Sequence, residues 1–238
     1  MSIQPSASII IPTYNQRPDF LDAAISSALA QWVPVEVIVV DDGSTVPVTD
    51  PRVDVIRHES NRGIAAALNT GIAASHADWI CWLSSDDLFT ERKVDLQLAA
   101  MGTCGAMAGF HAYQVQHEGD VGSAALQAGV CFLPLIWNNH REQQIRMVEG
   151  CYVNGSTTMI HRRVFDEVGP YDTTFRYAQD WEMWCRIASR YFWHYTPVVL
   201  GVRREHNNLT AQKDRDPAMK RAAIEEDNRV RAMYGSWA

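Results

Sequence analysis

The sequence predicts an α/β fold in which a mostly parallel sheet is flanked by helices within a single domain. Three observations predict this class. Segments typical of strands and helices alternate from residue 7 to residue 101, the strand segments are short continuous apolar runs, and polar residues follow several of these runs directly. Continuous apolar strands that alternate with helices are typical of a parallel sheet covered on both faces.

The elements of the first half follow from these patterns in order. Strands are expected where Val and Ile cluster, at 7–12, 35–40, 52–58 and 78–83. Apolar residues at helical spacing predict a helix over 17–32 with Asp19 as its N-cap. A helix of small residues is expected over 63–76, and Thr90 is expected to open a helix over 91–101. In such a sheet, ligands bind outside the carboxyl ends of the strands, so the polar residues there are the candidates for a site.

The second half has a looser pattern. We expect strands at 105–116 and 191–205 and a loop at 118–129. Residues 156–169 are expected to form a strand and a short helix closed by Gly169. Helices are expected at 134–148, 180–190 and 216–234, the last of them polar. No repeat or linker-like segment interrupts the chain. The prediction is therefore one domain over 1–238, with unequal halves at about 7–110 and 111–210 and a C-terminal helix over 211–238.

Composition excludes several function classes. The net charge of -7 argues against nucleic acid as a partner, because phosphate binding needs a basic face. The five cysteines are odd in number and form no C-x-x-C pair, as expected for reduced thiols of a cytoplasmic protein. No signal peptide is expected, and the longest apolar runs are too short to span a bilayer. Contact with a membrane surface, such as the inner face of the plasma membrane, stays compatible with the sequence.

Two adjacent acids, Asp86 and Asp87, follow the strand expected at 78–83 and lie beside Ser84 and Ser85. One interpretation is that the two acids cap or precede the next helix, whose positive end is stabilised by negative charge, although Thr90 is the better cap. The other is a hard-oxygen site for Mg²⁺ or Mn²⁺, whose charge would remove the repulsion between the acids. Such an ion is commonly completed by substrate phosphates, so the expected ligand is a diphosphate.

A second acidic pair, Asp41 and Asp42, follows the strand expected at 35–40. The sequence "DDGST" is good turn chemistry, and a carboxylate here could equally accept hydrogen bonds from a base or a ribose. The chain contains neither G-x-x-x-x-G-K-[ST] nor G-x-G-x-x-G, so metal and side chains would have to hold the diphosphate.

Two further residues are candidates. Asp180 in "RYAQDWEMWCRIASR" could cap the following helix, act as a general base aimed into the cleft, or do both. His206 in "RREHNNLT" is a lone histidine that would usually be structural, but it would supply a metal ligand if it faced Asp86.

Taken together, these segments resemble glycosyltransferase family 2, the inverting sugar-nucleotide transferases with the GT-A fold. The resemblance runs from about Ala7 to Thr210 and rests on the order of seven blocks: "SIIIPTYN", "VIVVDDGST", "NRGIAAALNTGI", "WLSSDDLFTERKV", "GSTTMIHRRVFDEVGPYD", "QDWEMWCRIA" and "RREHNNLT". It implies one GT-A domain in which residues 7–110 bind the nucleotide sugar and residues 111–210 bind the acceptor and carry the catalytic residue.

The resemblance also implies roles. It implies Asp180 as the catalytic base, a divalent cation (Mn²⁺ or Mg²⁺) at Asp86, Asp87 and His206, and nucleotide contacts from Pro12, Thr13, Tyr14, Asp41, Asp42, Asn69, Ser85 and Asp86. The implied reaction is metal-assisted single displacement from a UDP-type sugar donor to a hydroxyl of a glycan or a lipid-linked saccharide. Assembly of a bacterial polysaccharide is the pathway class that the resemblance suggests. Acceptor recognition is expected within residues 110–150.

The sequence departs from the family pattern at some positions, and two alternatives to the implied function stay open. Ser84 and Leu68 stand where an acid and an Arg are common, and Gln179 replaces the acid that often precedes the base. Ser84 and Leu68 keep open a nucleotide-sugar-binding module without catalysis, although Asp180 argues against it. A sugar nucleotidyltransferase is the other alternative, but it would normally show a Gly-rich basic loop after the first strand, which "IPTYNQRPDF" lacks.

Overall fold

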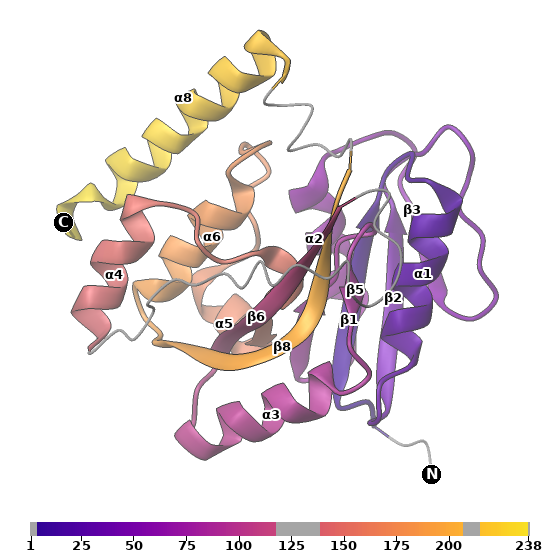
Figure 1. Ribbon diagram of the computed structural model, residues 1–238. Coiled ribbons are helices and arrows are strands. Elements are labelled where there is room, and N and C mark those ends of the chain that lie inside the picture. Colours follow the sequence, from indigo (N-terminus) through magenta and orange to yellow (C-terminus); the bar gives the residue numbers. More distant parts are fainter. Residues whose placement is uncertain (1–3, 118–138, 207–214, 238) are drawn as a thin grey trace.

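The computed structural model describes residues 4–117, 139–206 and 215–237, and the loop expected at 118–129 lies outside them. Within these ranges the strands form one eight-stranded sheet in the order β3-β2-β1-β4-β7-β6-β8-β5 (Figure 1). The strands are β1 Ala7–Thr13, β2 Val35–Asp41, β3 Asp54–Arg57, β4 Trp79–Trp82, β5 Leu88–Phe89, β6 Ala108–His117, β7 Met159–His161 and β8 Trp193–Glu205. The helices are α1 Pro18–Leu29, α2 Ile64–Ala74, α3 Lys93–Cys104, α4 His140–Glu149, α5 Arg162–Val168, α6 Gln179–Ala188 and α8 Pro217–Tyr234, with short 3-10 helices η2 Gly155–Thr157 and η3 Gly235–Trp237.

The N-terminal half confirms the predicted α/β class. β3, β2, β1 and β4 are parallel, and alternate residues of β1 face opposite sides of this sheet. Ile9 and Ile11 share a core with residues of α1, whereas Ile10 shares a second core with residues of α2. Gly71 lets α2 approach β1 closely, since a Cβ atom there would lie 2.3 Å from a methyl carbon of Ile10. The continuous apolar runs of the sequence are therefore strands buried on both faces.

The rest of the sheet is mixed, so the mostly parallel sheet also contains antiparallel pairings. β7 pairs antiparallel with both β4 and β6, and β8 pairs parallel with β6 and antiparallel with β5. Pairing of β4 with β7 joins the two halves into one sheet. Strand β5 has only two residues and was not expected from the sequence, because two residues carry no periodicity.

Two predicted helix starts are wrong. Helix α1 begins at Pro18, with Arg17 rather than Asp19 at the N-cap, because proline at the first position already suits a helix start. Helix α3 begins at Lys93 and not beside Thr90, whose backbone N–H donates to Leu200 O across the β5–β8 pair (3.0 Å). Because β5 separates Asp86 and Asp87 from α3, neither acid caps this helix.

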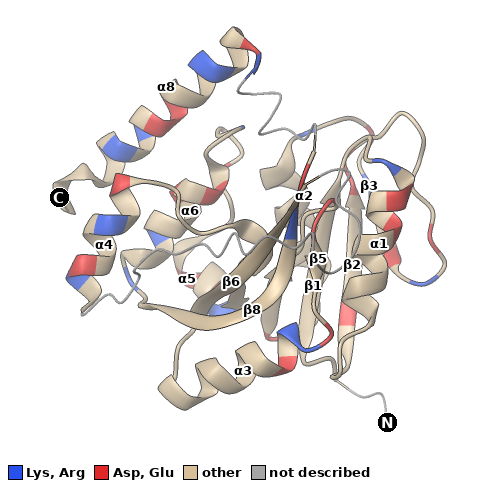
Figure 2. Ribbon diagram, viewed as in Figure 1, with Lys and Arg blue, Asp and Glu red and all other residues tan. Residues whose placement is uncertain are grey.

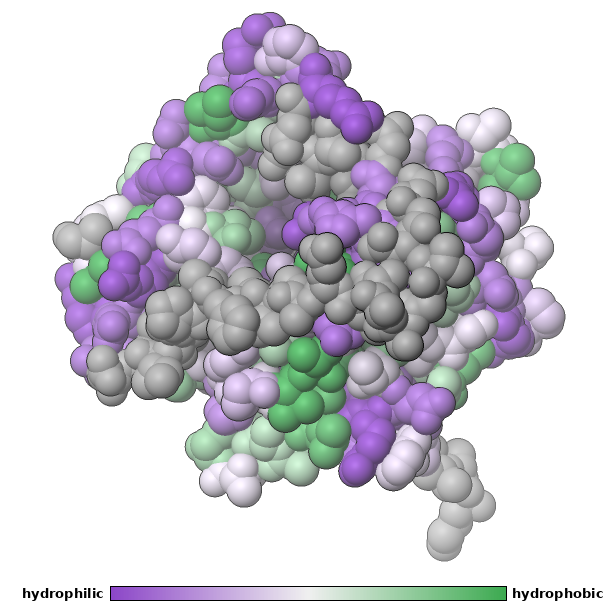
Figure 3. Space-filling model, in the orientation of Figure 1, coloured by the Kyte–Doolittle hydropathy of each residue, from purple (hydrophilic) through white to green (hydrophobic). Residues whose placement is uncertain are grey.

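Helices α4, α6 and α8 pack together on the side of the molecule away from α1 (Figure 1). Charges of both signs alternate along α8 (Figure 2), and this end of the molecule is mostly hydrophilic in Figure 3. Only Ala223, Glu226 and Val230 of α8 are buried, at the spacing of one helix face. Among the helices of the described ranges, none combines the length and the apolar character needed to cross a membrane.

Candidate active site

A cleft of about 570 Å³ lies at the carboxyl ends of β1, β2 and β4, between the two halves of the chain. This volume is within the range of small-molecule sites. The predicted site residues in its lining are Pro12, Thr13, Tyr14, Asp42, Ser85, Asp86, Asp87, Asp180 and His206. The sheet thus brings to one cleft residues that are far apart in the sequence, as the rule for parallel strands predicts.

Asp41 lies outside this lining and is fully buried beneath it. One carboxylate oxygen accepts the N–H of Ser44 (2.9 Å), and the other accepts the N–H of Val48 (3.1 Å) and an Arg57 N–H. Burial raises the pKa of this carboxyl group, but these hydrogen bonds outweigh it and leave the pKa below its usual value. Asp41 therefore fixes the loop after β2.

We expect Asp41→Asn to lower the free energy of unfolding by about 1–3 kcal/mol at pH 7, because the amide nitrogen cannot accept the Val48 and Arg57 hydrogen bonds. The folded-state pKa lies below the unfolded value of 3.8, so the ionised carboxylate stabilises the fold above that pH and loses this effect as the pH falls below it. Urea denaturation at pH 7 and at about pH 3 should show a smaller difference at the lower pH. An equal loss at both pH values, or the same loss in the exposed control Asp54→Asn, would contradict this account.

Asp42 faces the cleft and also holds the entrance to α2. Its carboxylate accepts hydrogen bonds from the N–H groups of Arg62 (3.0 Å) and Gly63 (2.8 Å) and contacts His58 Nδ1 at 2.6 Å. Gly63 has a φ of 90°, a conformation that favours glycine. The second acid after β2 thus shapes one wall of the cleft.

The β1 loop forms the neighbouring wall. Thr13 is buried and Tyr14 is half exposed, and the N–H of Asn15 donates to Ser44 Oγ at 2.9 Å. Among the described residues, three buried polar atoms of cleft-lining side chains have no hydrogen-bond partner: Thr13 Oγ1, Trp82 Nε1 and Gln179 Oε1. Buried polar groups are normally paired, so these atoms are suited to a polar ligand.

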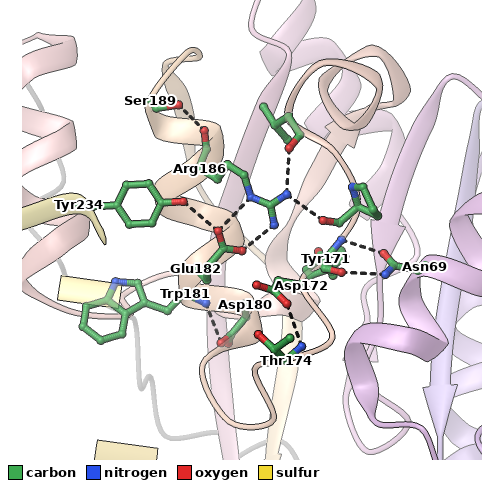
Figure 4. A network of polar contacts seen from close by, with 12 residues as sticks. Asn69, Tyr171, Asp172, Thr174, Asp180, Trp181, Glu182, Arg186, Ser189 and Tyr234 are labelled. Atoms are coloured by element: carbon green, nitrogen blue, oxygen red, sulfur yellow. Dashed lines mark hydrogen bonds and ion pairs between the residues drawn. The ribbon is translucent and has the colours of Figure 1, made fainter. Parts of the chain in front are cut away.

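Asn69, predicted to contact the nucleotide, is not part of the cleft lining. Its side-chain amide donates to Tyr171 O and accepts from Tyr171 N, both at 2.8 Å (Figure 4). This pair of hydrogen bonds connects α2 to the segment before α6. The geometry gives Asn69 the task of joining the two halves of the molecule beside the cleft.

Asp86 and His206 meet in the cleft although 120 residues separate them. His206 Nε2 lies 2.9 Å from Asp86 Oδ2, and the histidine ring packs edge-on against Phe20 with centroids 4.7 Å apart. The predicted condition for His206, that it face Asp86, is met. A carboxylate and an imidazole nitrogen are both ligands that Mn²⁺ accepts.

Asp87 is more deeply buried than Asp86. Its two oxygens accept hydrogen bonds from Ser156 Oγ (2.6 Å) and from the N–H of Arg204 (3.0 Å). Burial and the adjacent Asp86 charge raise the pKa of Asp87 to about 7. Through these two hydrogen bonds, Asp87 connects β8 and η2 to the end of β4.

The described residues contain no group of three or more His, Cys, Asp or Glu side chains arranged to hold a metal ion. Asp86 and His206 nevertheless fit a divalent cation as a partial ligand set. Mg²⁺ is commonly bound by one or two carboxylates together with substrate phosphates and water. The residues present are therefore suited to an ion that arrives with a phosphorylated ligand.

Asp180 is the second residue of α6, where Ala178 occupies the N-cap position. Of the interpretations left open for Asp180, the N-cap therefore does not hold, although one of its oxygens accepts the N–H of Trp181 at 2.8 Å (Figure 4). Acids in the first turn of a helix are favoured by its positive end, which supports an ionised carboxylate. Asp180 lines the same cleft as Asp86 and is carried by the other half of the chain.

Two cations that line the cleft, Arg176 and Arg203, were not among the site residues predicted from the sequence. Arg176 begins the stretch "RYAQD" and Arg203 the stretch "RREHNNLT", but no spacing rule distinguishes them from surface arginines. Asn154 and Tyr177 also line the cleft. Of the stretch expected to recognise the acceptor, residues 118–138 lie outside the described residues, as do Asn207 to Thr210 of the last block.

The family model described as Glycosyl transferase family 2 matches residues 8–169. The chain belongs to glycosyltransferase family 2. An uncharacterized glycosyltransferase of Rickettsia bellii is 31% identical over 233 residues, which cover 88% of this chain and 31% of the relative. The succinoglycan biosynthesis protein ExoO of Rhizobium meliloti is 37% identical over 110 residues, covering 43% of this chain and 31% of ExoO. The chain spans between 31% and 67% of the length of the Rickettsia relatives that it matches.

Solved structures agree with the GT-A class of this glycosyltransferase family. S. aureus TarS 1-349 in complex with UDP-GlcNAc has a TM-score of 0.63 at 15% identity, covering 85% of this chain and 59% of TarS. The UDP complex of the same protein also has a TM-score of 0.63, at 14% identity and with 61% of its chain covered. At this identity the likeness shows the fold alone, and it agrees with the GT-A fold that the resemblance implied.

Proposed function

We propose that this family 2 member transfers a sugar from a nucleotide diphosphate sugar to a hydroxyl of a glycan or lipid-linked acceptor, with inversion at the anomeric carbon. The observation that carries the proposal is that Asp180 and the Asp86–His206 pair line one cleft, Asp180 on helix α6 and Asp86 after strand β4. A base and a diphosphate site on opposite sides of a bound sugar are what a single displacement requires. In this proposal the two halves act as one catalytic domain.

Asp180 would accept the proton of the acceptor hydroxyl. Its carboxylate belongs to the first turn of α6, where the helix end favours the ionised form that a base needs. The deprotonated oxygen would attack the anomeric carbon from the face opposite the leaving nucleotide. One displacement inverts the configuration, so no covalent sugar–enzyme intermediate is needed.

The leaving nucleotide would lie toward Asp86 and His206. A divalent cation bound there would act as a Lewis acid on the departing diphosphate. Arg203, which also lines the cleft, would supply a fixed positive charge to the phosphates. Asp87 would hold this edge in shape through Ser156 and Arg204, and could contribute a carboxylate oxygen.

A UDP-sugar is the donor that we propose. The pocket wall built by Pro12, Thr13, Tyr14 and Asp42 supplies a half-exposed aromatic ring and buried polar groups for a nucleobase. Two structural neighbours are complexes of TarS with UDP and with UDP-GlcNAc, which supports the same choice. The names of ExoO and ExoU, both succinoglycan biosynthesis proteins, support a role in polysaccharide assembly.

A donor screen tests the proposed function. We expect at least one UDP-sugar to release free UDP in the presence of Mn²⁺, faster when a saccharide acceptor is added. A binding module without catalysis would bind the sugar nucleotide and release no UDP with any acceptor. A nucleotidyltransferase would instead form pyrophosphate from a nucleoside triphosphate and a sugar phosphate. Either of these two results would contradict the proposal.

A further inference from the structure

Glu226 is the one charged residue among the three buried residues of helix α8, and 9% of its surface is accessible. Its carboxylate accepts hydrogen bonds from three successive backbone N–H groups of another segment. Arg176 N lies 2.9 Å from Oε1 and 3.0 Å from Oε2, and the N–H groups of Tyr177 and Ala178 reach Oε2 at 2.7 and 2.9 Å. One buried carboxylate thus binds three consecutive backbone N–H groups, which fixes the conformation of that segment.

These donors belong to the entrance of α6. Ala178 is the N-cap of this helix and has no capping side chain of its own. Arg176 and Tyr177 lie just before the helix, so their N–H groups have no helical partner, and the helix dipole favours a negative charge beside this end. Glu226 supplies both the acceptor and the charge, from a helix 48 residues further along the chain.

The same segment forms one wall of the cleft. The side chains of Arg176, Tyr177, Gln179 and Asp180 all line it, so the backbone that Glu226 holds carries the proposed base and its neighbours. Within the described residues, the Glu226 carboxylate hydrogen-bonds to this segment and to no residue at the ends of β1, β2 and β4, which form the proposed donor side of the cleft. A substitution of Glu226 should therefore change the position of Asp180, the proposed base, more than it changes the binding of the nucleotide.

Other contacts hold α8 in register against α6 and the segment before it. Tyr234 Oη donates to Glu182 Oε1 at 2.8 Å, and Glu182 also forms an ion pair with Arg186 at 2.6 Å (Figure 4). Arg229 donates to Thr174 Oγ1 at 3.1 Å and lies over the Phe175 ring. Because these contacts do not involve Glu226, α8 should stay docked when the Glu226 carboxylate is changed.

We propose that Glu226 is a positioning residue, which sets the place of Asp180 by binding the backbone N–H groups of residues 176–178. The inference rests on the proposed function of Asp180 as the base. Glu226 and the α6 entrance both lie beyond residues 8–169, the part of the chain that the family model matches. In this proposal, helix α8 contributes to the active site by positioning Asp180 through Glu226.

Glu226→Gln tests the proposal, because the amide nitrogen is a donor and would face N–H groups. We expect kcat to fall by about 10- to 100-fold, as for a small misplacement of a catalytic group. The KM for the donor and the Kd for UDP should stay within about 2-fold, and Glu226→Asp should recover part of kcat because it keeps the carboxylate. Glu225→Gln is the matched control, since it removes the same charge from an exposed neighbour on the same helix.

Hydrogen exchange supplies a readout that does not need activity. In Glu226→Gln the amides of 176–178 should exchange faster, while those of α8 itself keep their protection. Unchanged kcat relative to Glu225→Gln, an equal loss of UDP affinity and kcat, or unchanged exchange at 176–178 would overturn the proposal. If wild-type protein transfers no sugar from any donor, the proposed function fails, and the exchange at 176–178 alone then decides whether Glu226 positions this segment.

Discussion

Asp180→Asn is expected to lower the turnover number of sugar transfer by about 10²- to 10⁴-fold, the contribution usual for a general base. Asparagine has the same shape, and its oxygen can still accept the N–H of Trp181, so the start of α6 should keep its conformation. What is lost is the basicity of the carboxylate. The affinity for UDP should stay within about 2-fold of the wild type, because the donor side of the cleft is built from other strands.

The measurement is steady-state transfer with the best donor of the screen, paired with calorimetry of UDP binding. Asp172→Asn is a matched control, since Asp172 belongs to the segment before α6 and does not line the cleft. Its oxygen accepts the N–H of Thr174 at 2.8 Å, a bond that asparagine can also make. Near-normal turnover of Asp180→Asn would remove Asp180 from the role of base.

Asp86→Ala is expected to weaken UDP binding in the presence of Mn²⁺ by at least about 10- to 100-fold. Changes to residues that only support a metal ligand cost this much, and Asp86 is a proposed ligand itself. In the presence of EDTA the wild type and the variant should bind UDP equally weakly. His206→Ala should show the same dependence on Mn²⁺ with a smaller loss, because the carboxylate that it contacts remains.

Calorimetry with Mn²⁺ and with EDTA separates a metal ligand from a residue that only shapes the cleft. Asp78→Ala is a suitable control, because Asp78 is an exposed acid at the opposite end of the same β4 region. Equal losses of affinity with and without Mn²⁺ would mean that Asp86 acts on the shape of the cleft. Unchanged affinity in Mn²⁺ would rule it out as a ligand.

The part of the fold that could be predicted is the part governed by local pattern. Continuous apolar runs such as 35–40 predict strands buried on both faces, and the rule for parallel sheets then predicts a site at their carboxyl ends. From the sequence alone, that rule predicts that Asp86 and Asp42 lie in one cleft. Asp180 and His206 needed the family resemblance, because no periodicity relates them to the first half of the chain.

The remaining features depend on contacts between distant residues. Asp41 and Asp42 are neighbours in one motif, yet only Asp42 faces the cleft, because Asp41 is bound by Arg57 and by the loop at Ser44 and Val48. Nothing local to Glu226 distinguishes it from the exposed Glu225 beside it. Helix α3 begins at Lys93 and not beside Thr90, because β5 pairs with β8, more than a hundred residues further along the chain.

A crystal structure of the Asp180→Asn variant with an intact UDP-sugar and Mn²⁺ tests the central claim most directly. The account predicts that the diphosphate lies beside Asp86 and His206 and that the anomeric carbon faces residue 180 across the cleft, with room between them for an acceptor hydroxyl. A nucleotide bound at another surface, or a sugar directed away from residue 180, would contradict it.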